Sequence, residues 1–223
     1  MKRRASSVTV ALACAGSMPV ARATTVITFE GFSANNTDIA LIVGYGDNVN
    51  GDTPDYTTSL GMGGEFGTPD LQVDWLDLGW DTYTGWDGRG SVAQTDYNGV
   101  PNPIVLVVDP TDTTAARIIG YDLDVWTGGT PAQIDWSVTG PDSGILANGS
   151  WIRAAAGRDT ITMPGGGVIG QVGESLSVNF LSVAGLASYL AMDNFIFDQV
   201  PEPSVALLGG MALGAAALRR RRQ

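Results

Sequence analysis

Apolar and polar residues alternate along much of the chain, which is the period-two pattern of half-buried β-strands. Leu71–Asp77 reads LQVDWLD, and in Tyr121–Trp126 the residues Tyr121, Leu123 and Val125 fall on one face while Asp122, Asp124 and Trp126 fall on the other. This pattern, with a continuous apolar run at 104–108, predicts strands at Thr25–Glu30, Leu71–Asp77, Ile104–Val108, Tyr121–Trp126, Gln133–Val138, Asp159–Met163, Ser175–Val183 and Tyr189–Phe197.

Turn-forming clusters separate these strands, as at Gly128–Pro131, Gly140–Asp142 and Pro164–Gly167. No capped stretch of ten or more residues with helical period lies among them. We therefore predict an all-β fold, an antiparallel two-sheet sandwich of jelly-roll-like form, with an N-terminal signal helix and a short C-terminal apolar helix. A β-helix is the alternative, but no fixed-period repeat supports it.

The N-terminus, residues 1–23, has the pattern of a secretory signal peptide. Basic residues at Lys2–Arg4 precede a short apolar run at Val8–Ala15, and small residues flank Arg22 in Ala21–Ala23, which predicts cleavage after Ala23. The alternatives are a buried N-terminal helix or a lipoprotein cleavage site at Cys14, to which the preceding residues match only loosely.

The C-terminus, residues 200–223, has three successive parts. Pro201, Glu202 and Pro203 precede an apolar run at Val205–Leu218, and four arginines at Arg219–Arg222 follow it. As a helix the apolar run spans about 21 Å, less than the ~30 Å hydrocarbon core of a bilayer. Such a helix inserts transiently and anchors weakly, with its arginines on the cytoplasmic side.

This ending resembles the PEP-CTERM sorting signal of Gram-negative-type bacteria. The resemblance implies that an exosortase, a membrane transpeptidase, recognises Pro201, Glu202 and Pro203 and removes the apolar helix after transient insertion in the inner membrane. It also implies export, with a signal peptidase as the other partner, to the cell surface or the extracellular matrix. A tail-anchored helix after a proline linker is the alternative.

Between the two ends, residues 24–199 form one predicted domain with a strong negative charge. Its basic residues are Arg89, Arg117, Arg153 and Arg158, against 22 of the chain's 23 acidic residues, so its net charge is near −18. This charge argues against nucleic-acid binding. The chain has no histidine, which excludes Ser-His-Asp triads and His-ligated metals, and the exported domain has no cysteine for a disulfide.

Three short motifs carry a second resemblance. They are Tyr45–Val49 (YGDNV), Thr68–Leu71 (TPDL) and Met192–Phe195 (MDNF). They resemble a recurring family of exported sandwich domains found with PEP-CTERM tails. That resemblance implies a β-sandwich similar to galactose-binding or carbohydrate-binding modules and implies no known activity.

Two segments offer oxygen ligands for calcium. Glu30 ends the first predicted strand, and Asp193 and Asn194 lie in the last; in carbohydrate-binding sandwiches such strands are commonly neighbours bridged by calcium. The alternative is that these are hydrogen-bonded strand-end residues. The loop Asp47–Asp55 is the second segment, and a polar turn is its alternative.

Aromatic residues interleaved with carboxylates form a candidate glycan-binding surface. The candidates are Trp80, Tyr83 and Trp86, joined by Trp126 on the polar face of its strand. Sugar rings stack on aromatic faces while carboxylates bind their hydroxyl groups, and aromatic rings offer a large contact area. The alternative places Trp75 and Trp80 in the core.

Together these patterns favour a non-enzymatic, exported module that binds extracellular polysaccharide. A passive structural component of the matrix is the alternative. A carboxylate-dependent glycosidase is the least favoured, because no pair of carboxylates stands out in the sequence. Calcium is the one cofactor that the sequence suggests.

Overall fold

In the computed structural model, every described residue lies within the unit Arg22–Glu202. The described residues are 24–29, 39–41, 45–46, 62–63, 68, 70–76, 80–85, 90–96, 104–110, 113–126, 132–153, 157–184 and 189–201. The predicted signal helix, the apolar C-terminal helix and the loop Asp47–Asp55 lie outside them. Within the described part, no helix is long and apolar enough to cross a membrane.

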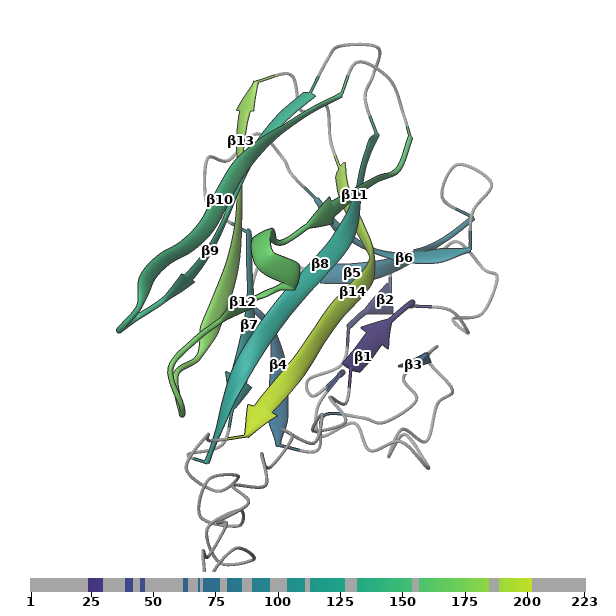
Figure 1. Ribbon diagram of the computed structural model, residues 1–223. Helices are drawn as coiled ribbons and strands as arrows, with labels where there is room; N and C mark the ends of the chain where they lie inside the picture. The colour runs from purple at the N-terminus through teal and green to yellow at the C-terminus, as the bar shows by residue number, and fades with distance from the viewer. Residues whose placement is uncertain are drawn as a thin grey trace, which may run out of the picture. The chain divides into compact units, whose positions relative to one another are not determined.

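The first sheet has nine strands and is built around β8 (Thr114–Trp126) and β14 (Tyr189–Pro201). Its main path runs β11-β8-β14-β6-β5-β2, with β1 also paired to β14, β12 to β8 and β3 to β1 (Figure 1). The other strands of this sheet are β1 (Thr24–Ile27), β2 (Ile39–Ala40), β3 (Met62–Gly63), β5 (Trp80–Thr84), β6 (Ser91–Asp96), β11 (Asp159–Thr162) and β12 (Val168–Ile169).

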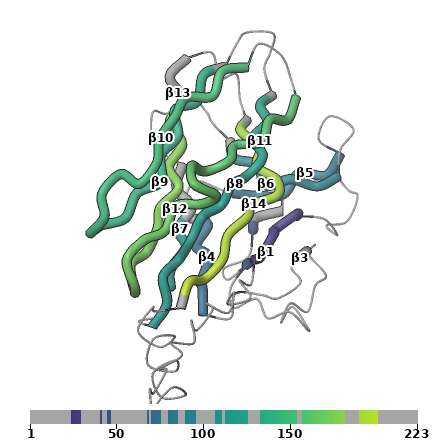
Figure 2. The backbone as a smooth tube through the Cα atoms, viewed as in Figure 1, coloured from purple at the N-terminus to yellow at the C-terminus, as the bar shows by residue number. Residues whose placement is uncertain are grey.

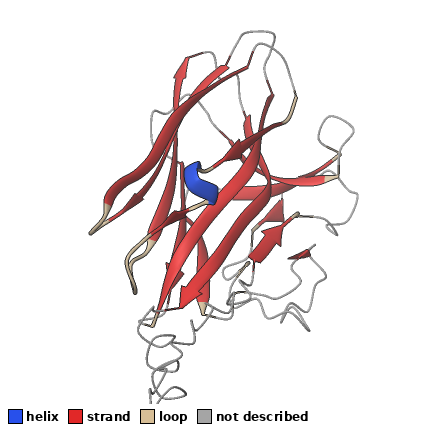
Figure 3. Cartoon of the chain, in the orientation of Figure 1, coloured by secondary structure: helices blue, strands red, loops and turns tan. Residues whose placement is uncertain are grey.

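The second sheet has five strands in the order β10-β9-β13-β7-β4. They are β4 (Leu71–Leu76), β7 (Ile104–Pro110), β9 (Ala132–Gly140), β10 (Gly144–Arg153) and β13 (Leu176–Ala184). Every pair in both sheets is antiparallel. The two sheets lie as separate layers (Figure 2), and the 3-10 turn η2 (Pro164–Gly166) is the one helical element in the described ranges (Figure 3).

The predicted all-β, antiparallel two-sheet sandwich is therefore confirmed for the described residues, and each predicted strand overlaps an observed one. The sequence prediction missed the longer strands β5, β6 and β10 and the two-residue strands β2, β3 and β12. In β10, two glycines and a bulge between Ile145 and Ala147 interrupt the alternation that marks a strand.

Aromatic rings fill the space between the two sheets. Tyr121 of β8 lies edge-on to Phe180 of β13, with ring centroids 5.4 Å apart, and Trp80 lies 6.4 Å from the same Phe180 ring. Trp75 is 5.6 Å from Trp80, and its indole N–H donates a 2.7 Å hydrogen bond to the carbonyl of Tyr45. Edge-to-face pairs of this kind add to the stabilisation from area burial. Trp75 and Trp80 therefore pack in the core, which was the alternative to a glycan-binding role.

A bulge in β14 changes the direction of its side chains midway. Asp193 pairs with Asp122 but Ile196 pairs with Gly120, so two residues of β14 stand opposite one of β8. Asn194 has φ of 47°, a left-handed conformation that asparagine adopts more readily than most residues. Since bulges re-aim side chains, this one brings both Asp193 and the Asn194 amide toward β8.

Glu174 connects the turn between β9 and β10 to the chain just before β13. Its Oε1 accepts hydrogen bonds from the amides of Asp142 (2.8 Å) and Ser143 (2.6 Å), and its Oε2 from the Gln171 amide (2.6 Å) and the Ser143 hydroxyl (2.5 Å). A Cβ at residue 140 would overlap this carboxylate, so Gly140 makes room for it. Burial raises the pKa of Glu174, but these four hydrogen bonds outweigh burial and lower the pKa to about 2.

We predict that Glu174→Gln lowers the free energy of unfolding by about 3 kcal/mol at pH 7, because an amide cannot accept all four hydrogen bonds. The folded pKa of about 2 lies below the ordinary 4.5. Ionised Glu174 therefore stabilises the native protein fully above pH 4.5, and this contribution is lost as the pH falls through 2.

Urea unfolding from pH 7 to pH 2 measures both effects. The wild type should lose stability relative to Glu174→Gln in the acid part of this range, and parallel curves for the two proteins would refute the assignment. Ser175→Ala, which removes an exposed hydroxyl next in the sequence, is the control and should be nearly neutral.

Candidate functional site

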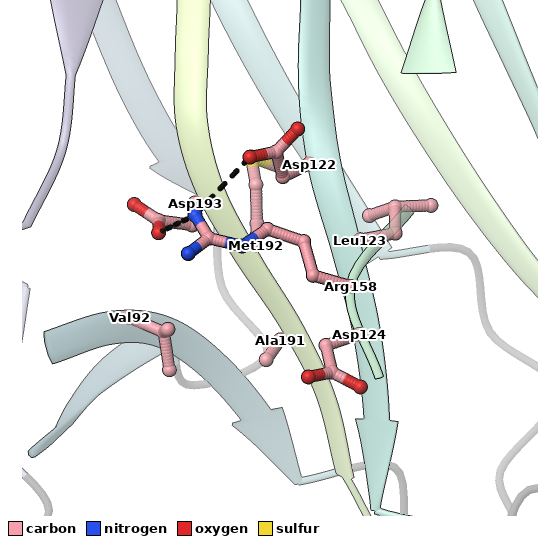
Figure 4. Close-up of a pocket in the computed structure, with 8 residues that line it drawn as sticks. All are labelled: Val92, Asp122, Leu123, Asp124, Arg158, Ala191, Met192 and Asp193. Carbon is pink, nitrogen blue, oxygen red and sulfur yellow. Dashed lines mark hydrogen bonds and ion pairs between the residues drawn. The ribbon is translucent and has the colours of Figure 1, made fainter. Parts of the chain in front are cut away.

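One cluster of charged side chains lies on the outer face of the nine-stranded sheet, where Figure 4 shows it. We call it the Arg158 cluster, and it consists of Arg158, Asp122 and Asp193, which Figure 4 labels, together with Asn194 and Thr160. Its position follows from alternation: Tyr121 and Leu123 of β8 point into the core, so Asp122 between them points outward.

Arg158 holds the two carboxylates of the cluster together. Its Nη1 donates to Asp193 Oδ2 at 2.6 Å and to Asp122 Oδ2 at 3.2 Å. Asp122 and Asp193 are cross-strand partners of β8 and β14, so without the guanidinium two like charges would stand side by side. The arginine thus neutralises a repulsion that the strand register itself creates.

Uncharged donors also bond to these two carboxylates. Asp122 accepts hydrogen bonds from the Thr160 hydroxyl (2.6 Å) and the Asn194 side-chain amide (2.7 Å), and Asp193 accepts one from the Asn194 backbone N–H (2.8 Å). The neighbouring Asp124 accepts from the backbone N–H groups of Val125 and Gly157, both at 2.8 Å. These contacts join β8, β14 and the segment that leads into β11.

The calcium prediction named Glu30, Asp193 and Asn194. Glu30 lies outside the described residues, and both Asp193 and Asn194 are engaged in the Arg158 cluster. The positive charge that a buried carboxylate requires comes here from Arg158. Across the described ranges no group of three His, Cys, Asp or Glu side chains is placed to hold a metal ion.

The depression beside the cluster is small. Its volume is only about 10 Å³, and besides the cluster it is lined by Asp124 and by apolar side chains such as Val92 and Ala191. Ligand pockets are typically about 300–1,000 Å³. A small volume over carboxylates that already have partners indicates a structural cluster, not a ligand site.

A larger hollow lies on the outer face of the five-stranded sheet, over β9, β10 and β13. Its volume is about 460 Å³. We call it the polar hollow; the residues that line it are Asp135, Trp136, Ser137, Asn148, Gly149, Ser150, Asn179 and Leu181.

Alternation along β9 and β13 places polar side chains in the polar hollow. Ile134 and Val138 are fully buried in the core, so Asp135 and Ser137 point outward. On β13, Val178 and Phe180 are buried in the same way, which turns Asn179 outward. The period-two polar positions in 133–139 and 175–181 were visible in the sequence, but only the sheet order shows that they are adjacent.

Hydrogen bonds within the polar hollow fix two of its polar groups. Asp135 Oδ1 accepts from the Ser150 hydroxyl at 2.5 Å and from the Gln133 amide at 3.2 Å. The Asn179 side-chain amide donates to Thr139 Oγ1 at 3.1 Å and to the backbone carbonyl of Ser177 at 3.2 Å. The polar groups are thus held in place before a ligand arrives.

Trp136 is a floor residue of the polar hollow but belongs to the core. Its ring lies at 90° to Tyr121, with centroids 6.3 Å apart. A Cβ at residue 149 would overlap the Trp136 ring, so the ring lies over Gly149 on the core side. Trp136 therefore supports the hollow and does not project into it.

The predicted aromatic glycan surface is not the polar hollow. Trp80 has only 2% of its surface exposed and packs in the core, which corrects its prediction as a stacking residue. Tyr83 lies on the other sheet, half-buried against Val92 and Ala191. Trp86 and the side chain of Trp126 lie outside the described residues.

The sorting motif is described only at its first residue. Pro201 is the last residue of β14 and pairs with Thr114 of β8, while Glu202 and Pro203 lie outside the described residues.

Each described arginine of the domain is paired with a carboxylate. Arg117 Nε lies 3.1 Å from Asp198, which is fully buried, and Arg153 pairs with Asp159 at 2.5 Å. Arg158 bridges Asp122 and Asp193 as above. The lining of the polar hollow includes no arginine or lysine and one carboxylate, Asp135.

Comparisons with known proteins give weak likenesses. No protein-family model matches the chain, and no curated protein matches it. An arabinose-bound MgGH51 α-L-arabinofuranosidase is 11% identical with a TM-score of 0.39, over 78% of this chain and 28% of that one. An exo-β-agarase is 13% identical with a TM-score of 0.35, over 60% of this chain and 23% of that one. The chain thus spans about a quarter of the length of these two enzymes.

Carbohydrate-binding modules are among the other similar structures. The family 32 module from C. perfringens NanJ, in complex with galactose, is 14% identical with a TM-score of 0.32, over 58% of this chain and 91% of that one. The family 11 module from Clostridium thermocellum, in complex with a β-1,3-1,4-mixed-linked tetrasaccharide, is 13% identical with a TM-score of 0.31, over 57% and 82%. These scores are too low to carry an argument, so the site is judged on its own geometry.

We predict that Arg158→Met destabilises the protein by about 2–3 kcal/mol, because it leaves Asp122 and Asp193 side by side in a largely buried position. The matched control is Arg153→Met, which breaks the more exposed pair with Asp159 and should cost less than about 1 kcal/mol. Thermal and urea unfolding of both variants measure the difference. Equal losses would contradict the assignment of Arg158 as the residue that neutralises the cluster.

Proposed function

We propose that this chain is a non-catalytic polysaccharide-binding module whose ligand occupies the polar hollow over β9, β10 and β13. The observation that carries the proposal is the hollow itself, about 460 Å³ in volume and lined by amide, hydroxyl and carboxylate side chains. Its volume lies within the range typical of ligand sites.

The side chains of the polar hollow have the hydrogen-bonding capacity that sugar hydroxyls require. A hydroxyl both donates and accepts; Asn148 and Asn179 offer both functions, and Asp135 offers acceptors. Leu181, with 40% of its surface exposed, offers an apolar contact for the C–H face of a sugar ring.

Charge narrows the class of polysaccharide. The hollow contains Asp135 and no basic side chain, and the described arginines are engaged in ion pairs. A uronate or sulfate ester would approach a domain of net charge near −18 and find no cation among the described residues that line the hollow. The ligand that fits is therefore an uncharged glycan.

Binding without catalysis is favoured by the number of carboxylates. Glycoside hydrolysis generally uses two, one acid and one base or nucleophile, on either side of the bond that breaks. Asp135 is the single carboxylate lining the polar hollow.

Export and sorting are the second part of the proposal and rest on the sequence. The basic and apolar N-terminal residues and the Pro201–Pro203 motif, followed by an apolar run and four arginines, support secretion and exosortase processing. In this proposal the domain is released at the cell surface or into the extracellular matrix of a Gram-negative-type bacterium, where extracellular polysaccharide is present.

We predict that the exported protein is retained on at least one neutral polysaccharide, and that Asp135→Ala weakens binding at least about tenfold, or ~1.4 kcal/mol. Affinity electrophoresis and isothermal titration against a panel of neutral and anionic glycans measure this. Each assay is run with calcium and with chelator, which tests the calcium prediction separately.

The matched control is Asp109→Ala. Asp109 is a carboxylate on the outer face of the same sheet, and like Asp135 it accepts a hydrogen bond from a serine hydroxyl, that of Ser175. It lies outside the polar hollow. It should leave affinity unchanged. Retention on no glycan would exclude the binding proposal and favour a passive structural component, and preference for anionic glycans would contradict the charge argument.

For the tail, we predict that Glu202→Ala blocks processing in a host with an exosortase, because it removes the charged residue of the motif. Mass spectrometry of the surface fraction should show wild-type protein beginning at Thr24 and lacking the apolar run, and the variant retaining it. Ser204→Ala is the control and should be processed normally. Retention of the tail in the wild type would contradict exosortase sorting.

A further inference from the structure

β10 (Gly144–Arg153) is an edge strand of the five-stranded sheet. In the described part of the chain it pairs on one side with β9 and with no strand on the other. Edge strands present backbone N–H and C=O groups that are free to pair with another strand. Figure 1 shows the β9–β10 hairpin at the margin of its layer.

β10 lacks charge and proline, two of the features that usually protect an edge. It is ten residues long, and from Gly144 to Ile152 it has no charged residue and no proline. The edge strand at the other end of this sheet, β4, is shorter and carries an exposed Asp74. Charge on an edge strand is a common protection against pairing with another chain, so β4 has this protection and β10 does not.

Two large apolar side chains stand exposed on β10. Ile145 has 67% of its surface exposed and Ile152 has 66%, the two highest values among the exposed large hydrophobic residues of the described chain. They lie near opposite ends of the strand, on its outer face.

The net charge of the domain limits where a second copy can approach it. Two copies with a charge near −18 repel each other over most of their surfaces. An uncharged strand of nine residues is where two such copies can approach without placing carboxylates opposite each other. Identical strands pair antiparallel about a two-fold axis, the commonest symmetry of protein dimers.

A two-fold axis at Gly149 gives a register that agrees with the strand's own alternation. It places Asn148 opposite Ser150 of the second copy, and both are outward-facing. It also places Ala147 opposite Trp151, and both are buried. Because of the bulge between Ile145 and Ala147, Ile152 of one copy then lies beside Ile145 of the other.

We infer that β10 is a docking edge for a second copy of this chain, and that the two five-stranded sheets join there into one continuous ten-stranded sheet. The inference does not depend on the proposed function. If both hold, the two polar hollows meet at the junction, since Asn148 and Ser150 line each hollow and lie on β10. The dimer then presents one continuous surface to an extended ligand.

Sedimentation velocity of the full chain, expressed with its own signal segment, tests the inference over a range of protein and salt concentrations. We expect a monomer–dimer equilibrium that higher salt shifts toward dimer, because salt screens the repulsion between acidic domains. Ile152→Glu, which lies outside the polar hollow, should raise the dissociation constant at least about tenfold without loss of folding, since the side chain is exposed.

The matched control is Gln72→Glu, which adds the same charge at an exposed position on the other edge strand, β4. It should leave the equilibrium unchanged. A wild type that stays monomeric at its highest soluble concentration, or a dimer that Gln72→Glu weakens and Ile152→Glu does not, would overturn the inference.

The register has its own test in disulfide cross-linking. With Cys14→Ala in every variant, oxidation of an equal mixture of Asn148→Cys and Ser150→Cys should give mainly the mixed disulfide, because these Cβ atoms face each other in the proposed register. Random pairing of the two variants would overturn the register centred on Gly149. Glycan affinity of Ile152→Glu is measured in parallel, so loss of dimer and loss of binding are distinguished.

Discussion

The long antiparallel pairing of β8 with β14 organises the rest of this structure. Each strand has 13 residues, and their ladder runs from Tyr189–Trp126 at one end to Pro201–Thr114 at the other. Their inner faces supply Tyr121 to the aromatic core, and their outer faces bring Asp122 next to Asp193. The register of β8 against β14 therefore determines both the core and the Arg158 cluster. A shift of one residue in this register would turn inward-facing side chains outward and outward-facing ones inward.

A small number of arginines neutralise the carboxylates that the fold buries in this acidic domain. Arg158 neutralises two carboxylates that the register places together, and Arg117 does the same for the fully buried Asp198. Glu174 shows the other solution, in which backbone and hydroxyl donors stabilise a carboxylate without a cation. The arginines thus serve the fold, and the polar hollow is left to uncharged groups and one aspartate.

The sequence predicted the strand-rich fold well because alternation is a local property. It predicted that Tyr121 faces inward, and that Asp122 and Asp124 face the other way. It could not tell that Trp80 is buried, because which face of a strand is covered depends on the layer opposite. Nor could it find the polar hollow, because Asp135 and Asn179 become neighbours only through the order β10-β9-β13, a long-range pairing that no local pattern encodes.

The position of Pro201 at the end of β14 has a mechanical consequence. A pull on the chain beyond this residue acts along the axis of β14, which is bonded to β8 on one side and to β6 and β1 on the other. Force in that direction loads many interstrand hydrogen bonds together in shear, instead of opening them one at a time. Traction applied through the C-terminal segment is therefore distributed over the whole central ladder of the sheet.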